Sequence, residues 1–293
     1  MRILSKLIPP ALDGRTVRAL LESELHCSSS LIKRLKRRAG SVTLNGVPVL
    51  RVDMRVAAGD ILAADVDDDI PIPANMPCCI PIVYEDDDIL ILNKPAGIAV
   101  HAAGMTALAG TVAEAVCAYL GGRALHCINR LDRGTSGLMA VAKSGYVHEL
   151  MRRSLHTSLS REYRAITLGR VSPPNGLIDL PIARERESAV RRCIDWEGFP
   201  SRTRYETLAV GNDYTYLRVV PETGRTHQIR VHMAAIGYPL AGDWLYGIED
   251  PELIARPALH SYRLTMASPI TGKAIDVTAP LPEDMTALLE KMR

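Results

Sequence analysis

Residues 129–137 read NRLDRGTSG, and this stretch places one acid, Asp132, between Arg130 and Arg133 ahead of four small residues. Strand-like segments stand on either side of it, ALHCINRLD at 124–132 and GLMAVAKS at 137–144. Glycine, serine and threonine favour a turn, so the pattern predicts Asp132 where a strand runs into a turn at a rigid sheet edge. On a strand Arg130 and Asp132 would share one face. Taken alone, a surface ion pair that starts a turn is the more frequent explanation.

The elements predicted around this stretch do not alternate strand and helix. Strands are predicted in IVYEDDDILILNKP (82–95), in EYRAITLGRV (162–171) and in TYLRVVP (215–221). Helices are predicted in TVAEAVCAYLGG (111–122), which opens on a T-x-x-E capping box, in SGYVHELMRRSL (144–155), and in HQIRVHMAAIG (227–237) with Thr226 as cap and Gly237 as end. Segment 184–204 is dense in charge and predicts an exposed loop or long hairpin. This order favours an α+β fold with a mixed, mainly antiparallel central sheet.

The first 74 residues predict a separate small domain. A short helix is expected at 16–25, a second at 31–39 with serine caps before it and Gly40 as its end, and a hairpin around Asn45-Gly46. A strand is expected at the end of 56–62. Residues 67–81 carry three acids and four prolines and predict a linker. We therefore expect one domain over 1–74 and another over 75–293.

A cluster of cations covers one face of the second predicted helix. With five cations in six residues, this face could follow a phosphate backbone, although a solvated helix face is the commoner cause of such a run. The four residues that we single out as candidate RNA contacts are Lys33, Arg34, Arg37 and Arg38.

Composition limits the class of protein. The 293 residues carry a net charge of only +2, so any nucleic-acid surface must come from local clustering. No export signal or membrane-length apolar run is visible, which favours a cytoplasmic protein with no membrane partner. Neither nucleotide-binding glycine motifs nor zinc-like ligand pairs occur, so we expect no cofactor and no metal. We also expect a monomer, and free thiols at Cys27, Cys78, Cys79, Cys117, Cys127 and Cys193.

A second candidate site lies in ETGRTHQIRVH, residues 222–232, where Arg225, His227, Arg230 and His232 stand within eight residues. Helix N-termini bind phosphates, so Arg225, which lies before the first turn of the predicted helix, favours an anionic partner. Arg230, one turn inside, could reach a buried carboxylate. A solvated basic face is an equally good explanation of these residues alone.

Several blocks resemble one known family in the family's own order. NRLDRGTSGLMAVAKS resembles the H-R-L-D-x-x-T-S-G signature of the RluA family of pseudouridine synthases. The segment SLIKRLKRRAGSVTLNGVPV at 30–49 resembles an S4-type RNA-binding domain. Further similar blocks are KPAGIAVH at 94–101, REYRA at 161–165, GRTHQIRVHMAAIGYPLAGDWLYG at 224–247 and LHSYRLTMASPITGK at 259–273.

The resemblance implies that the chain turns uridine in RNA into pseudouridine, without net redox change and without a cofactor. It implies that Asp132 is the essential group, which attacks C1′ or removes a sugar proton. Arg230 would be the partner that keeps Asp132 ionised, and Tyr163 would lie against the base. Arg130 would fill the gap left when the uridine flips out, a step that costs a few kcal/mol.

Two positions depart from the family pattern. Asn129 stands where a histidine is usual, and it can replace part of that residue's hydrogen bonding but cannot titrate near neutrality. Arg161 stands where a lysine is usual, which keeps the charge but changes the geometry.

Three alternatives remain open from the sequence. The chain could be a non-catalytic RNA-binding or assembly factor on the same fold, although the complete residue set speaks against it. It could be a hydrolase, although glycosidases usually pair two carboxylates. As a synthase it could act on ribosomal RNA, which the S4-like segment favours, or on transfer RNA.

Overall fold

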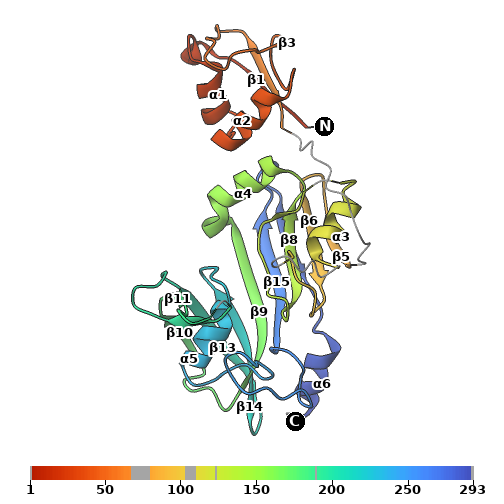
Figure 1. Cartoon of the computed structure of the whole chain (residues 1–293), viewed down its shortest axis with the longest axis vertical. Helices are drawn as coiled ribbons and strands as arrows, with labels where there is room; N and C mark the ends of the chain where they lie inside the picture. Colours follow the sequence, from red (N-terminus) through yellow and green to blue (C-terminus); the bar gives the residue numbers. More distant parts are fainter. Residues whose placement is uncertain (1, 67–79, 103–109, 123, 189, 292–293) are drawn as a thin grey trace.

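The computed structural model describes residues 2–66, 80–102, 110–122, 124–188 and 190–291. Two sheets carry the architecture (Figure 1). The N-terminal sheet has four strands in the order β1-β4-β2-β3, joined by two helices. Its elements are β1 (Ile3–Leu7), α1 (Val17–Ser23), α2 (Ser29–Arg37), β2 (Val42–Leu44), β3 (Val47–Pro48) and β4 (Ile61–Asp65).

Local sequence signals explain most of this small domain. Thr16 and Ser28 cap α1 and α2 by accepting backbone N–H groups with their side chains. Asn45 and Gly46 both take positive φ angles, 52° and 81°, in the turn between β2 and β3, as the predicted hairpin requires. Gly40 is also left-handed, two residues after the cap of α2. Strand β1, which pairs with β4, was not anticipated from the sequence.

The second sheet has ten strands and confirms the α+β prediction. Eight follow the order β10-β13-β14-β9-β15-β8-β6-β5, with β16 beside β15 and β7 beside β8. The β15–β8 pair is parallel, whereas the other strand pairs described for this sheet are antiparallel. The strands are β5 (Ile82–Glu85), β6 (Ile89–Lys94), β7 (His126–Cys127), β8 (Ser136–Ala142), β9 (Leu159–Leu168), β10 (Asn175–Asp179), β13 (Arg202–Val210), β14 (Tyr214–Pro221), β15 (Leu259–Ala267) and β16 (Ala274–Thr278).

Helices pack around this sheet. The helices are α3 (Val112–Tyr119), α4 (Gly145–Ser158), α5 (Gln228–Ala235) and α6 (Glu283–Lys291). The capping box predicted for Thr111 and Glu114 is present at α3. Helix α4 lies at the end of the sheet nearest the N-terminal domain (Figure 1), and one buried cluster joins its Tyr146 and Met151 to residues of that domain, including Cys27.

Two local predictions near the candidate site are wrong. The strand predicted over 124–132 is limited to β7, because the Asn129 side chain pairs with strand β8 in place of a backbone ladder: its Oδ1 accepts from the Ala140 N–H at 2.7 Å. Arg130 and Asp132 lie beyond the end of β7, so the prediction that they share one face of a strand is wrong. Thr226 is not the cap of α5, since His227 takes that position with a φ of +58°.

Other predictions are confirmed or fall outside the described residues. The first part of the charged segment 184–204 lies in a hairpin of β11 (Ile182–Arg184) and β12 (Arg192–Ile194), whereas its last residues, from Arg202, begin β13 of the large sheet. Free thiols are found at Cys27, Cys117, Cys127 and Cys193, while Cys78, Cys79 and the expected boundary at residue 74 lie outside the described residues. No helix in the described ranges is long and apolar enough to cross a bilayer.

Candidate active site

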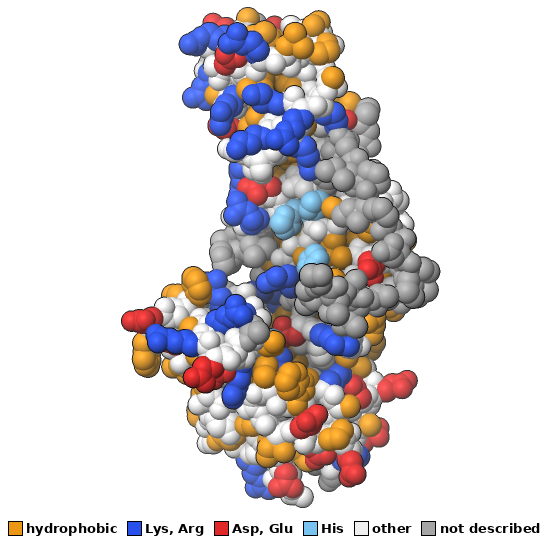
Figure 2. Space-filling view, viewed as in Figure 1, with side chains coloured by type: hydrophobic (Ala, Val, Ile, Leu, Met, Phe, Trp, Pro, Cys, Tyr) orange, Lys and Arg blue, Asp and Glu red, His pale blue; other side chains and the backbone are white. Residues whose placement is uncertain are grey.

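A cleft of about 1540 Å³ brings the separate motifs of the large sheet together. It exceeds the roughly 300–1,000 Å³ of small-molecule pockets, so its size suits a segment of a polymer. Six of the residues that the sequence singled out in this domain line it: Arg130, Asp132, Tyr163, Arg225, His227 and Arg230. His232 does not, because its ring is buried against the Thr203 hydroxyl and the Leu180 carbonyl. Figure 2 shows Lys and Arg side chains along the visible face from the N-terminal domain to the central hollow.

Asp132 sits in the turn between β7 and β8, where the Thr135 N–H donates to its carbonyl at 3.1 Å. Its carboxylate is about one quarter exposed, and Oδ2 lies 3.7 Å from Arg230 Nη1 and 3.9 Å from His227 Nε2. Within the described residues, Arg230 is the charged partner of Asp132, and the His227 ring approaches the same oxygen. Both groups come from α5 and its cap, and the sequence neighbours Arg130 and Arg133 take no part in these contacts.

Arg230 is fixed by a carboxylate that the sequence analysis missed. Its Nε and Nη2 donate to the two oxygens of Asp243, both at 2.7 Å, and the Asp243 side chain is fully buried. Asp243 Oδ1 also accepts from the backbone N–H groups of Leu245 and Tyr246. Arg230 was expected to reach a buried carboxylate, and Asp243 is that group. The sequence feature that could have identified this group is the aspartate of GDWLYG. It lies thirteen residues after Arg230, in the same segment, 224–247, that resembles the family.

The turn that carries Asp132 is held in place by Lys94. The buried ammonium donates to the carbonyls of Pro95, Ile98 and Arg133 at 2.9, 3.0 and 3.3 Å. Burial lowers the pKa of Lys94 to about 8, so the group remains charged at neutral pH. Arg133 Nε donates to the Gly97 carbonyl at 2.9 Å, and the Gly97 N–H donates back to the Arg133 carbonyl at 2.8 Å. These bonds fix the backbone next to Asp132.

His227 faces the acid from the other side. Its Nδ1 lies 2.8 Å from the Tyr246 hydroxyl, which accepts the backbone N–H of Arg192 at 2.8 Å. Burial lowers the pKa of His227, so the ring is neutral at neutral pH. In the tautomer that accepts the Tyr246 hydroxyl proton at Nδ1, the ring N–H stands on Nε2, which is the nitrogen toward Asp132.

Tyr163 belongs to β9 and is only 6% exposed, with burial raising its pKa. Its phenol is therefore protonated at neutral pH. Arg161, two residues earlier on the same strand, also lines the cleft and donates from Nη2 to the Thr223 carbonyl at 3.1 Å. The arginine that replaces the usual lysine thus connects β9 to the segment before α5.

The predicted RNA contacts of the N-terminal domain stand apart from the cleft. Lys33 and Arg37 are exposed on α2, whereas Arg34 and Arg38 are half-buried. Arg38 Nη2 lies 2.8 Å from the Asp65 carbonyl and 2.6 Å from its Oδ2. Among the described residues, no group of three His, Cys, Asp or Glu side chains could hold a metal ion.

Comparisons with known proteins show the family of the chain. The family described as RNA pseudouridylate synthase matches residues 88–235, which include Asp132, Tyr163 and Arg230. An uncharacterized RNA pseudouridine synthase of Bacillus subtilis, YlyB, is 36% identical over 87% of this chain and 86% of its own length. The ribosomal large subunit pseudouridine synthase D of Haemophilus ducreyi is 37% identical over 86% of this chain and 83% of its own.

Solved structures agree on the fold. Human RNA pseudouridylate synthase domain containing 1 superposes with a TM-score of 0.58 at 24% identity, covering 73% of this chain and 94% of that one. The chain therefore belongs to the RluA family of RNA pseudouridine synthases, which are isomerases.

Proposed function

We propose that this enzyme converts specific uridines of large-subunit ribosomal RNA into pseudouridine, with Asp132 as the essential group. The observation that carries the role of Asp132 is its position on a cleft of polymer size, 3.7 Å from the anchored guanidinium of Arg230. The substrate class is supported by similar synthases whose names specify the large ribosomal subunit.

The reaction breaks the bond from C1′ to N1 and rejoins C1′ to C5 of the same base. Asp132 starts it, either by attack on C1′ or by removing a sugar proton, and both routes need an ionised carboxylate. Arg230 Nη1 lies 3.7 Å from Asp132 Oδ2 and places a positive charge beside that carboxylate. The proton on C5 must leave before pseudouridine is released. No electrons are gained or lost overall.

Tyr163 is suited to hold the base during its turn. Because burial raises the pKa of its phenol, the hydroxyl carries its proton at neutral pH and is a poor base. We assign it packing and hydrogen bonding against uracil. Arg130, exposed at the cleft, is assigned to the space that the flipped uridine leaves in the RNA.

A hydrolytic role is less well supported. Two other carboxylates line the cleft, Glu222 and Asp276. Asp276 is paired with Arg263, and Glu222 is paired with Arg202 and Arg204. Both carboxylates are thus already paired with arginines. A glycosidase needs a second carboxylate that is available beside the glycosidic bond, and neither Glu222 nor Asp276 meets this requirement.

The test is to incubate the protein with unmodified large-subunit rRNA and, separately, with unmodified tRNA transcripts. Carbodiimide mapping should find pseudouridine at defined positions in the rRNA. Pseudouridine in the tRNA alone would contradict the substrate proposal, and release of free uracil would indicate a hydrolase. The same mapping on cellular RNA with and without the gene would identify the target uridine.

A further inference from the structure

An aromatic side chain is exposed on the turn that follows the β11–β12 hairpin. The chain contains a single phenylalanine, Phe199, and its side chain is 66% exposed. Phenylalanine is among the residue types most often buried. An exposed ring on a surface that already carries cations is therefore a candidate contact for a ligand.

The position of this ring is fixed by the backbone. The Phe199 N–H donates to the Ile182 carbonyl at 2.9 Å, and the Ile182 N–H donates to the Phe199 carbonyl at 3.0 Å. The preceding Gly198 donates to the Asp195 carbonyl at 2.8 Å, and a Cβ at Gly198 would come within 2.6 Å of the Ile182 backbone. The turn is thus closely packed, so presenting the ring to a ligand costs little conformational entropy.

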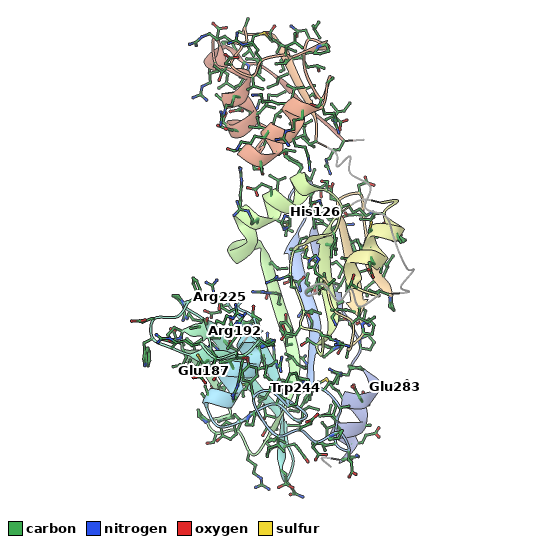
Figure 3. The ribbon with its side chains drawn as sticks, in the orientation of Figure 1. His126, Glu187, Arg192, Arg225, Trp244 and Glu283 are labelled. Atoms are coloured by element: carbon green, nitrogen blue, oxygen red, sulfur yellow. The ribbon has the colours of Figure 1, made fainter. Side chains whose placement is uncertain are left out.

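A cation of the cleft lies against the ring. The Arg225 guanidinium carbon is 5.2 Å from the Phe199 ring centroid, within cation–π range. Arg225 is itself exposed and lines the cleft that contains Asp132. Figure 3 labels it on the lobe that carries β10, β11 and β13, together with Arg192. Phe199 and Arg225 therefore form one continuous surface at the rim of the cleft.

We propose that Phe199 and Arg225 form a stacking platform for a nucleotide next to the target uridine. The inference rests on the proposed function, because it requires an RNA strand in the cleft. A uridine that leaves its stack also leaves a neighbouring base without a partner. Aromatic rings and guanidinium planes take up such bases in single-stranded RNA. Arg225 adds a positive charge within reach of the phosphate.

The charges around the two exposed aromatic side chains of this region indicate that RNA binds at Phe199 and not at Trp196. Arg191 and Arg192 belong to the same hairpin, and Arg191 lies over the Tyr246 ring at 5.8 Å. A second exposed aromatic, Trp196, is 81% exposed but stands between Asp195 and Glu197 in the sequence. Its acidic neighbours disfavour a phosphate, which makes Trp196 a matched control.

The test compares Phe199→Ala with Trp196→Ala in the full chain, using an unmodified large-subunit rRNA transcript as the probe. Phe199→Ala should weaken binding about tenfold, within the range measured for removal of a base–aromatic stack. Its effect should fall on KM more than on kcat. Trp196→Ala should stay within twofold of wild type, and Phe199→Tyr should recover most of the affinity. Thermal unfolding checks that each variant is folded.

Equal affinities for Phe199→Ala and Trp196→Ala would overturn the platform. A double-mutant cycle of Phe199→Ala with Arg225→Gln gives a second criterion: the two effects should be non-additive, and strictly additive effects would show that the two side chains do not act as one surface. Failure of the proposed function gives a different result, because the wild type would then bind the transcript without forming pseudouridine in it.

Discussion

Arg230 commits two guanidinium nitrogens to Asp243 and turns the third, Nη1, toward Asp132 at 3.7 Å. The two carboxylates therefore interact with the same guanidinium in different ways. Asp243 is buried and accepts two hydrogen bonds from it, whereas Asp132 is partly exposed and lies near its positive charge without a close hydrogen bond. This leaves the oxygens of Asp132 available for the substrate while the cation is held in place by the fork geometry of a bidentate pair.

Asp243→Asn should therefore reduce both stability and turnover. The substitution leaves a buried guanidinium without its countercharge, which costs about 3–5 kcal/mol when one partner of such a pair is removed. Arg230 would be drawn toward Asp132, which should lower kcat more than it raises KM. The measurements are urea unfolding and steady-state kinetics on rRNA.

The matched control for Asp243 is Asp276→Asn. Asp276 also binds an arginine, Arg263, but both side chains are about half exposed, and exposed surface pairs contribute little to stability. Equal effects of the two substitutions on stability and kcat would contradict the anchoring role of Asp243.

Asp132→Asn should abolish pseudouridine formation while the fold and the RNA affinity remain near those of wild type. The amide keeps the shape of the carboxylate but is neither a nucleophile nor a base. The assay is pseudouridine yield in a single turnover, with binding measured on the same RNA. Residual activity within tenfold of wild type would remove Asp132 from the proposed role.

Much of the fold was visible in local patterns. The capping residues Ser28 and Thr111 marked helix starts, and the Asn45-Gly46 turn marked the first hairpin. These signals depend on a few neighbouring residues, so sequence alone carries them. The order of strands in the large sheet, by contrast, depends on pairings such as β15 with β8 and β9 that are distant along the chain.

The contact between Arg230 and Asp132 was expected from the family resemblance and not from the residues around Asp132. The local sequence pointed to the neighbours Arg130 and Arg133, whereas the structure brings in Arg230 and His227 from nearly one hundred residues away. Asp243 could not be assigned, because its pairing depends on how the loop after α5 folds back. The strand predicted at 124–132 failed because the buried side chain of Asn129 takes the place of the strand's own backbone bonds.

Stability should fall at acidic pH partly through His260. This ring is 1% exposed, lies 2.9 Å from the Ser136 hydroxyl and 3.3 Å from the Ala279 carbonyl, and burial lowers its pKa to about 4. Between about pH 6.5 and 4, His260 is protonated in the unfolded chain but stays neutral in the native protein. The free energy of unfolding therefore decreases as the pH falls through this range. The full effect is about 3 kcal/mol.

The check is denaturant unfolding of wild type and His260→Gln from about pH 7 to 4.5, the window between the two pKa values of the ring. The variant should begin less stable and lose less stability over this range. Parallel curves for wild type and His260→Gln would show that this group does not cause the pH dependence.

The basic face of α2 should bind phosphates independently of the cleft. We expect Lys33→Gln with Arg37→Gln to weaken rRNA binding and to flatten the slope of log K against log salt by roughly 0.9 for each phosphate that is no longer bound, borrowing the coefficient for duplex DNA. These two cations are exposed on α2, whereas Arg38 is already engaged by Asp65. Deleting residues 1–74 is a less clean test, because the buried cluster shared with Tyr146 and Met151 of α4 would be opened.

The control for α2 is the pair Arg18→Gln and Arg51→Gln in the same domain. Arg18 and Arg51 are exposed too, but they are paired with Glu22 and Asp53 at 3.1 and 2.6 Å, so their charge is already compensated. This control should leave the salt slope close to wild type, and single-turnover rates at saturating enzyme should be similar in both double variants. If the Lys33 and Arg37 substitutions give a line parallel to wild type with equal affinity, α2 is only a solvated face. RNA affinity would then have to come from the cleft side, where Arg225, Arg191 and Arg192 lie.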